Sequence, residues 1–310
     1  MDTVPTVFII ETQSLMGWTR QLLQLSSEWG RVAAKREKKK PTSLYLKKSA
    51  QSDAVFFAFS DGDLWDSIQN NPLCPYYVHE VYFCKEGLAF SHNLVDNPEH
   101  LAYHELNPSN LRKLCSILSK NSYGVTLNLV HSVHFDMTRL MPLIWAVPRV
   151  IEFSEDKFKG DPTLSLAIFR RAVERGTLLT YAPRGEVAVT QDHLDSFETL
   201  AASRVFRRLA FVWSEESEVP YETMLHKLVD KWLHRNDVDR FMMEVSTSKT
   251  AVMREMLEAQ GLQMDLQDGK MEIFTKEGRR FRVRYVPLAS SWFAFTEYFN
   301  KISINRKMFR

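Results

Sequence analysis

Two kinds of hydrophobic pattern alternate along the first half of the chain. Short continuous apolar runs are typical of buried strands, whereas apolar residues three or four positions apart are typical of amphipathic helices. The predicted strands lie at 4–10, 54–60, 76–83 and 124–135, and the predicted helices at 15–25 and 111–120. Strands that alternate with helices indicate a layered architecture. We therefore expect an α/β domain over residues 1–155, with a mixed or mainly parallel sheet and flanking helices.

The second half of the chain is richer in helical patterns and closes with a predicted meander of strands. The predicted helices lie at 163–176, 193–213, 220–233 and 248–260, and the strands at 262–267, 271–276 and 279–287. The turns Asp268-Gly269 and Glu277-Gly278 separate these strands. We expect a mainly helical α+β domain over residues 160–310, ending in the meander and an aromatic and basic tail. Helix, helix and hairpin is the order of a winged-helix module, and also of many other α+β endings.

Composition places the chain among folded globular proteins, because 45% of its 310 residues are hydrophobic and 12% are aromatic. The three cysteines, Cys74, Cys84 and Cys115, show no CxxC spacing, and the N-terminus lacks the pattern of a secretory signal. These features predict the nucleus or the cytoplasm. The longest apolar runs are shorter than the roughly 20 residues of a membrane-spanning helix, so no membrane association is expected.

A net charge of +2 is small for this length, so any attraction to nucleic acid must come from local clusters. The first cluster lies in a stretch, 31–42, that we expect to be an exposed basic loop. Such a loop suits phosphate binding or nuclear localisation, and an ordinary solvated loop is the alternative. Its basic residues are Lys35, Arg36, Lys38, Lys39 and Lys40.

A second basic cluster lies in the last predicted strand. Alternation places Arg280, Arg282 and Arg284 on one face of that strand and apolar residues on the other. A row of guanidinium groups suits phosphate oxygens or the carboxylates of an acidic partner.

Histidines concentrate between residues 79 and 134 and are the best indication of an enzyme. Zinc or manganese could take ligands from such a region, but HExxH is absent, and strand alternation would place the last two histidines on opposite faces. Scattered packing and surface histidines are the alternative. The candidate metal ligands are His100, His104, His131, His134 and Asp136.

Short catalytic and nucleotide-binding motifs do not occur in the sequence. Neither GxGxxG nor GxxxxGK[ST] follows the first predicted strand, which ends at Glu11, and GxSxG is absent. Our first hypothesis is a non-enzymatic adaptor or scaffold subunit of an intracellular, nucleic-acid-associated complex, with other protein subunits and DNA or RNA as partners and no cofactor. The alternative is a metal-dependent hydrolase or nuclease that uses the histidine-rich region 79–136.

Overall fold

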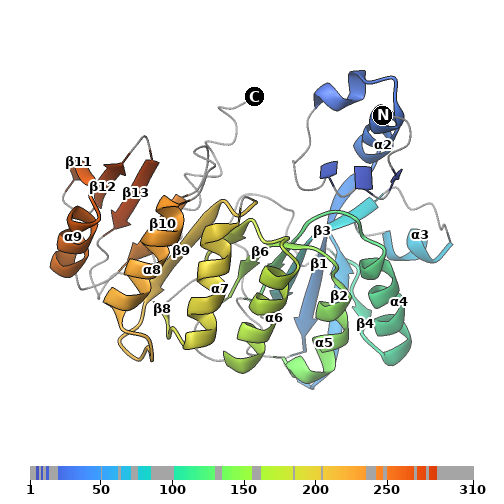
Figure 1. Cartoon of the computed structure of the whole chain (residues 1–310). Coiled ribbons are helices and arrows are strands. Elements are labelled where there is room, and N and C mark those ends of the chain that lie inside the picture. The colour runs from blue at the N-terminus through green and yellow to red at the C-terminus, as the bar shows by residue number, and fades with distance from the viewer. Residues whose placement is uncertain are drawn as a thin grey trace. The chain divides into compact units, whose positions relative to one another are not determined.

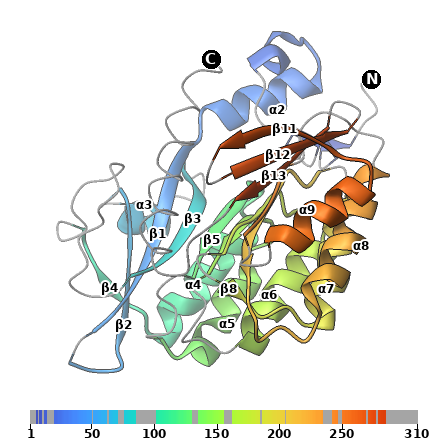
Figure 2. The same ribbon diagram turned by 90° about the vertical axis from the view of Figure 1, so that its left-hand side faces the viewer.

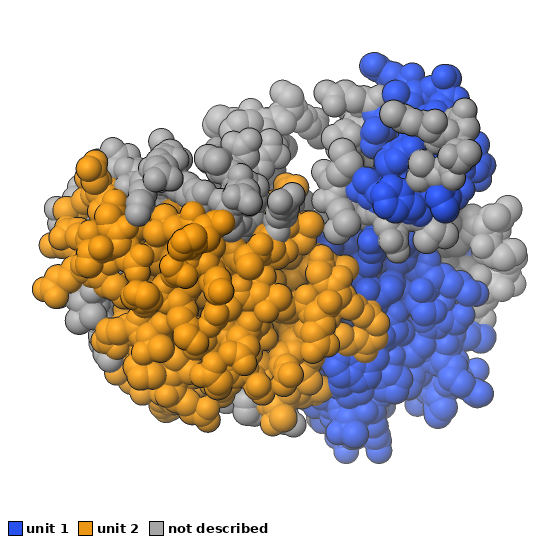
Figure 3. Space-filling view, in the orientation of Figure 1, with its two compact units in different colours: residues 1–151 blue, residues 152–310 orange. Residues whose placement is uncertain are grey.

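The chain forms two compact units, residues 1–151 and residues 152–310, in a computed structural model (Figures 1 and 3). Each unit contains strands and helices and is described separately. The structure describes residues 5–6, 8–9, 12–13, 20–49, 51–61, 64–70, 76–84, 101–129, 135–155, 162–183, 186–203, 205–234, 242–246, 250–268, 271–276 and 279–284.

Unit 1 contains a mixed sheet with flanking helices, as the sequence predicts. The strand order is β4-β2-β1-β3-β5; β3 runs parallel to β1 and β5, whereas β2 runs antiparallel to β1 and β4. The elements are η1 Arg20–Gln24, α2 Glu28–Glu37, β1 Lys40–Lys48, β2 Val55–Phe59, α3 Leu64–Asn70, β3 Tyr76–Cys84, β4 His104–Glu105, α4 Pro108–Ser119, β5 Val125–Asn128 and α5 Met137–Ala146.

Local sequence signals explain several of these elements. Asn107 caps α4, because its side chain accepts a hydrogen bond from the backbone of Asn110, and Pro108 fits the first helical position. Alternation in β1 and β3 then builds the core of the sheet. Leu44 pairs with Val81 and Leu46 with Phe83, and all four side chains are buried.

The strand predicted over 4–10 is wrong. Thr6, Phe8 and Ile9 are helical, and the Ile9 backbone N–H donates to the Pro5 carbonyl oxygen at 3.2 Å. Ile9 and Gln13 are both buried and lie four positions apart, so a helix turns them to the same side. That shared burial outweighs the strand preference of the β-branched residues in this stretch. Glu11 lies outside the described residues.

The basic loop predicted over 31–42 is also wrong. The stretch comprises the end of α2, a short turn at Lys38 and Lys39, and the beginning of β1. The sequence argument found no apolar partner for the basic residues, but Val32 and Ala33 are buried and α2 packs against η1. The basic residues can therefore be exposed on regular secondary structure.

Unit 2 continues the alternation of strand and helix. Its strand order is β11-β12-β13-β10-β9-β7-β6, and β8 also pairs with β9. The pairs from β6 to β10 and the pair β10 with β13 are parallel, and the meander β11-β12-β13 is antiparallel. The elements are β6 Val150–Ser154, α6 Pro162–Glu174, β7 Thr180–Tyr181, β8 Glu186–Val187, α7 Gln191–Ala202, β9 Arg208–Trp213, α8 Tyr221–Leu233, β10 Met242–Ser246, α9 Thr250–Ala259, β11 Gln263–Asp268, β12 Met271–Lys276 and β13 Arg279–Arg284.

Helices α6, α7 and α8 stand side by side along the strands of unit 2 (Figures 1 and 2). The single helix predicted over 193–213 is wrong, because α7 ends at Ala202 and the rest of the stretch contains β9. In β9, Leu209, Ala210, Phe211 and Trp213 are buried. A continuous buried run of this kind is typical of a strand inside a parallel sheet, and periodicity alone does not distinguish it from a buried helix.

The predicted ends of two helices are confirmed. Gly176 and Gly261 have positive φ angles of 63° and 79° and lie two positions after the last residues of α6 and α9. Each is followed by a residue whose N–H donates back across the helix end, Thr177 to Ala172 and Leu262 to Leu257. This pairing is the Schellman motif, for which glycine is suited because it lacks a Cβ atom.

The three strands of the meander form as predicted, and β13 also pairs with β10, so it lies inside the sheet rather than at its edge. The winged-helix arrangement is not confirmed. The aromatic and basic tail lies outside the described residues. No helix in the described part of the chain is long and apolar enough to cross a membrane.

Candidate functional site

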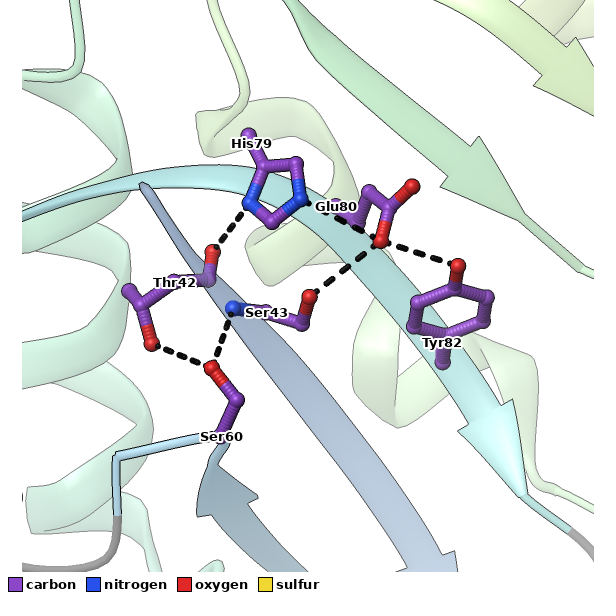
Figure 4. Close-up of polar contacts among 6 residues, drawn as sticks. All are labelled: Thr42, Ser43, Ser60, His79, Glu80 and Tyr82. Carbon is purple, nitrogen blue, oxygen red and sulfur yellow. Dashed lines mark hydrogen bonds and ion pairs between the residues drawn. The ribbon is translucent and has the colours of Figure 1, made fainter. Parts of the chain in front are cut away.

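A cluster of polar side chains lies at a β-bulge between β1 and β3 in unit 1. Thr42 pairs with Val78, but the next residue, Ser43, pairs with Glu80, so His79 is one extra residue in β3. Side chains from β1, β2 and β3 meet at this point (Figure 4). We call them the Glu80 cluster: Thr42, Ser43, Ser60, His79, Glu80 and Tyr82.

Three side chains converge on one carboxylate oxygen of Glu80. The Tyr82 hydroxyl donates to Oε2 at 2.9 Å and the Ser43 hydroxyl donates to it at 3.2 Å. The Nε2 atom of His79 lies 3.4 Å from the same oxygen. The other oxygen, Oε1, points away from the cluster (Figure 4).

His79 is held from both sides of its ring. Its Nδ1 atom lies 2.9 Å from the carbonyl oxygen of Thr42, which can only accept a hydrogen bond, so Nδ1 carries a proton. A proton on Nε2 as well makes the ring an imidazolium facing the Glu80 carboxylate. This charged pair satisfies both ring nitrogens.

The pKa values of both partners move toward the charged forms. Burial acts against the imidazolium, but the hydrogen bond and charge of Glu80 and the Thr42 carbonyl outweigh it and raise the pKa of His79. Burial likewise acts against the carboxylate, yet the donors His79, Tyr82 and Ser43 lower the pKa of Glu80. Each partner therefore favours the charged form of the other.

The hydroxyls of the cluster connect β2 to β1. Ser60 directly follows β2, and its Oγ atom accepts from the Ser43 backbone N–H at 3.0 Å and lies 3.0 Å from the Thr42 hydroxyl. The Ser60 backbone N–H donates in return to the Ser43 carbonyl oxygen. These bonds fix the three strands at the bulge.

The order of these groups differs from that of a nucleophilic triad. In a triad, the imidazole accepts the proton of the serine and a carboxylate orients the imidazole. Here the Ser43 hydroxyl donates to Glu80, so the carboxylate stands between serine and histidine. The cluster therefore joins neighbouring strands, and in this arrangement the Ser43 hydroxyl and the His79 ring both face the carboxylate.

A second carboxylate, in unit 2, has a different environment. Glu155 directly follows β6, and the Tyr181 hydroxyl donates to its Oε1 atom at 2.8 Å. Tyr181 is fully buried among Phe153, Phe169 and Phe197. Desolvation raises the pKa of Glu155 to about 7, although the tyrosine hydrogen bond opposes it.

The predicted metal ligands do not form a site in the described part of the chain. His104 packs against the rings of Phe57 and Trp65, and Asp136 caps α5 and pairs with Arg139. Among the residues that the structure describes, no group of three or more metal-ligating side chains lies together. His100, His131 and His134 lie outside the described residues, so the zinc or manganese hypothesis stays a prediction.

Exposure of the first basic cluster is confirmed. We call Lys35, Lys38, Lys39 and Lys40 the lysine segment, and all four are exposed. Arg36 lies in α2, and its side chain is outside the described residues.

The second basic cluster, Arg280, Arg282 and Arg284, lies in β13. Its backbone register pairs Arg282 with Glu244 of β10 and with Ile273 of β12. The side chains of these arginines are outside the described residues, so their exposed face stays a prediction.

Sequence reasoning missed the Glu80 cluster because strand alternation places His79 and Glu80 on opposite faces. The bulge removes that alternation. The adjacent polar pair inside an otherwise apolar strand, VHEV, was the available sign.

Comparisons with protein-family models, with curated proteins and with solved structures find no match for this chain.

Proposed function

We propose that the protein is a non-enzymatic adaptor subunit of a nucleic-acid-associated complex in the nucleus or cytoplasm, and that the lysine segment supplies its contact to nucleic acid. The observation that carries the proposal is the exposure of four lysines within six consecutive positions, 35–40. Phosphate oxygens are attracted to such a concentration of ammonium groups, and the attraction does not depend on sequence.

The backbone around the lysine segment supports the same proposal. Val32 and Ala33 anchor α2, and β1 pairs with both β2 and β3 directly after the lysines. Regular elements on both sides hold the backbone of the segment, so the lysines stay close together without the ordering of a loop when a partner binds.

The Glu80 cluster supports a binding role over a catalytic one. Serine, histidine and glutamate are residue types that catalyse acyl transfer. In this cluster, however, the Ser43 hydroxyl donates to Glu80, and the His79 ring lies between Glu80 and the Thr42 carbonyl oxygen. Three strands and a fixed charged pair make a stable scaffold for a binding surface.

The test compares two triple charge reversals in full-length protein. K38E/K39E/K40E changes the lysine segment, and R112E/K113E/K120E makes the same charge change on exposed residues of α4 and its C-cap in the same unit. Binding to fluorescently labelled single-stranded and duplex DNA and RNA is measured by anisotropy. We expect the first variant to weaken binding by about tenfold or more and the second by much less.

An equal effect of the two variants would contradict the lysine segment as the contact, and absence of binding by the wild-type protein would contradict the proposal itself. Thermal unfolding of both variants controls for damage to unit 1.

The second basic cluster, in the β13 strand of the meander, is a further proposed contact to nucleic acid, as the winged-helix hypothesis implies. If so, R280E/R282E/R284E should weaken binding of nucleic acid without unfolding unit 2. Unchanged affinity would remove β13 from the proposed surface.

A further inference from the structure

Strands β6 and β7 of unit 2 are joined over a short length. In the described part of the chain, two pairs of residues are in register, Glu152 with Thr180 and Phe153 with Tyr181. The next backbone N–H, that of Ala182, donates to the Phe153 carbonyl oxygen across 3.5 Å, which is long for such a bond. The described backbone bonds therefore hold the carboxyl end of the β6–β7 pair only weakly.

A side-chain hydrogen bond continues the connection past these backbone bonds. The Tyr181 hydroxyl of β7 donates at 2.8 Å to Oε1 of Glu155, which directly follows β6. The Phe153 ring, two positions before Glu155, is stacked on the Tyr181 ring with centroids 6.0 Å apart. The hydrogen bond thus ties the chain that leaves β6 to a ring on β7.

Of the two partners, Tyr181 is the fixed one. Its ring is fully buried and lies 4.3 Å from the ring of Phe169 and 5.8 Å from that of Phe197, measured between centroids. Glu155 is only partly buried, so a small shift of the chain after β6 is enough to hydrate its carboxyl group. Opening of this end therefore separates Glu155 from Tyr181 and leaves the aromatic cluster in place.

Charged groups on the neighbouring strands face away from Glu155. Glu152 of β6 and Arg208 of β9 are both in register with Thr180, one position before Tyr181. Strand alternation therefore turns their side chains to the face of the sheet opposite the Tyr181 ring.

Charged groups on the helices that pack against Tyr181 have partners of their own. Arg170 of α6 pairs with Asp192 of α7 at 3.1 Å, and the Nδ1 atom of His193 lies 2.9 Å from the Thr190 hydroxyl. The shift in the pKa of Glu155 has two causes, burial and the Tyr181 hydrogen bond. No described positive charge therefore offsets the desolvation of an ionised Glu155. The ionisable groups of these two helices nearest to the aromatic cluster in sequence are Arg170, Arg171, Asp192 and His193.

We propose that Glu155 is a pH-sensitive latch at the carboxyl end of the β6–β7 pair. The neutral carboxyl group stays bonded to Tyr181 and keeps this end closed. In the open form, water surrounds Glu155 and the group ionises, so each opening near neutral pH releases a proton. We call this device the Glu155 latch, and it does not depend on the proposed contact to nucleic acid.

The direction of the pH effect follows from the two environments of Glu155. Its pKa is about 7 in the closed form and near the ordinary value of 4.5 when water surrounds it. The contribution of the latch to the closed form is therefore complete below pH 4.5 and is lost as the pH rises to 7. Opening becomes more frequent over this range and then levels off.

Hydrogen exchange of the full-length protein at about pH 5 and about pH 8 measures the opening, after correction for the pH dependence of intrinsic exchange. The reporters are the amides of β6 and β7, above all that of Ala182, and the reference is α8 in the same unit. We expect the equilibrium constant for opening at β6 and β7 to be at least about tenfold larger at the higher pH, and that of α8 to change much less.

The matched variants are E155Q, at the latch, and E174Q, at an exposed glutamate of α6. We expect E155Q to abolish the increase in opening between the two pH values, because the amide does not ionise, and E174Q to retain it. The wild-type comparison between β6–β7 and α8 decides the question even if E155Q does not fold.

An opening constant that is equal at the two pH values would overturn the Glu155 latch. An increase of the same size in α8, or an increase that persists in E155Q, would overturn it as well. Opening that becomes more frequent toward pH 5 would assign the titration to His193 instead. Burial lowers the pKa of His193 to about 4, so an opening that hydrates this ring takes up a proton.

Discussion

Glu80 in unit 1 and Glu155 in unit 2 each accept a hydrogen bond from a tyrosine hydroxyl, at 2.9 Å and 2.8 Å. Nevertheless, their pKa values move in opposite directions, below the ordinary range for Glu80 and up to about 7 for Glu155. Glu80 has two further partners, His79 and Ser43, and one of them is positively charged. For Glu155, desolvation outweighs the single hydrogen bond from Tyr181.

The comparison shows that one neutral donor does not keep a desolvated carboxylate ionised. A positive partner and a second donor reverse the outcome, because they favour the charged form more than burial opposes it. Unit 1 therefore holds a carboxyl group whose pKa is lowered by its partners, whereas unit 2 holds a carboxyl group whose pKa is raised to about 7.

The largest expected effect is that of E155Q at alkaline pH. The folded-state pKa of Glu155 is raised from 4.5 to about 7, so its contribution to stability is complete below pH 4.5 and is lost as the pH rises through 7. The difference corresponds to a loss of up to about 3 kcal/mol in the free energy of unfolding. The amide that E155Q introduces retains an acceptor for Tyr181 and cannot ionise.

Urea unfolding at about pH 5 and about pH 8.5 measures this effect. We expect E155Q to resemble the wild type at the lower pH and to be more stable at the higher one, whereas the exposed-residue control E174Q shows no such gain. A wild-type protein and an E155Q variant that respond equally to pH would contradict the assignment of Glu155.

The next largest effect concerns His193, which lies near Tyr181 in the same aromatic cluster. Burial lowers its pKa from 6.5 to about 4, so its contribution to stability is present above pH 6.5 and is lost as the pH falls toward 4. H193Q keeps a side-chain acceptor at this capping position of α7. As the pH falls from about 7 to about 4, the free energy of unfolding of H193Q should decrease by about 2 kcal/mol less than that of the wild type, which urea unfolding would detect. An equal decrease in the two proteins would show that groups other than His193 cause it.

Removing the hydroxyl of Tyr181 or of Tyr82 tests whether the cost of losing one hydrogen bond depends on how many other donors the carboxylate has. Y181F leaves the Glu155 oxygen without the hydroxyl that binds it and should cost about 1.5 kcal/mol, whereas Y82F leaves Glu80 two other partners and should cost about 0.5 kcal/mol. Y181F should also steepen the loss of stability with rising pH, because the tyrosine hydrogen bond lowers the pKa of Glu155. Equal costs for the two variants would contradict the comparison.

E80Q should cost about 1 kcal/mol, less than Y181F, because both partners of the pair are partly exposed and water screens their attraction. The Glu80 contribution is present above pH 4.5 and is lost as the pH falls, and the His79 contribution is present below pH 6.5 and is lost as the pH rises. The cost of E80Q should therefore be greatest between these values. A cost that is constant with pH would show that the lost packing, and not the charged pair, is responsible.

Local signals in the sequence predicted much of the fold. The Asn107 cap, the glycines after α6 and α9, and the turns of the meander act within a few residues, so a single sequence contains the necessary information. The errors occurred where tertiary burial decides: the helical residues within 5–13, and the change from α7 to β9. Periodicity alone did not place those boundaries.

The candidate sites were less predictable than the fold. Exposure of the lysine segment follows from its composition, but its position at the end of α2 and the beginning of β1 does not. The Glu80 cluster depends on a bulge that moves one residue out of register, and the raised pKa of Glu155 depends on its desolvation beside Tyr181. Each of these requires a distance between strands that the sequence does not give.

The most direct test of the proposed function is the salt dependence of binding to single-stranded nucleic acid. The wild-type protein should show a linear fall in the logarithm of affinity with the logarithm of salt concentration, and K38E/K39E/K40E should have a slope smaller by about 2, because about three phosphate contacts are lost. An identical slope for the two proteins, or an affinity that does not change with salt, would contradict a contact to nucleic acid through the lysine segment.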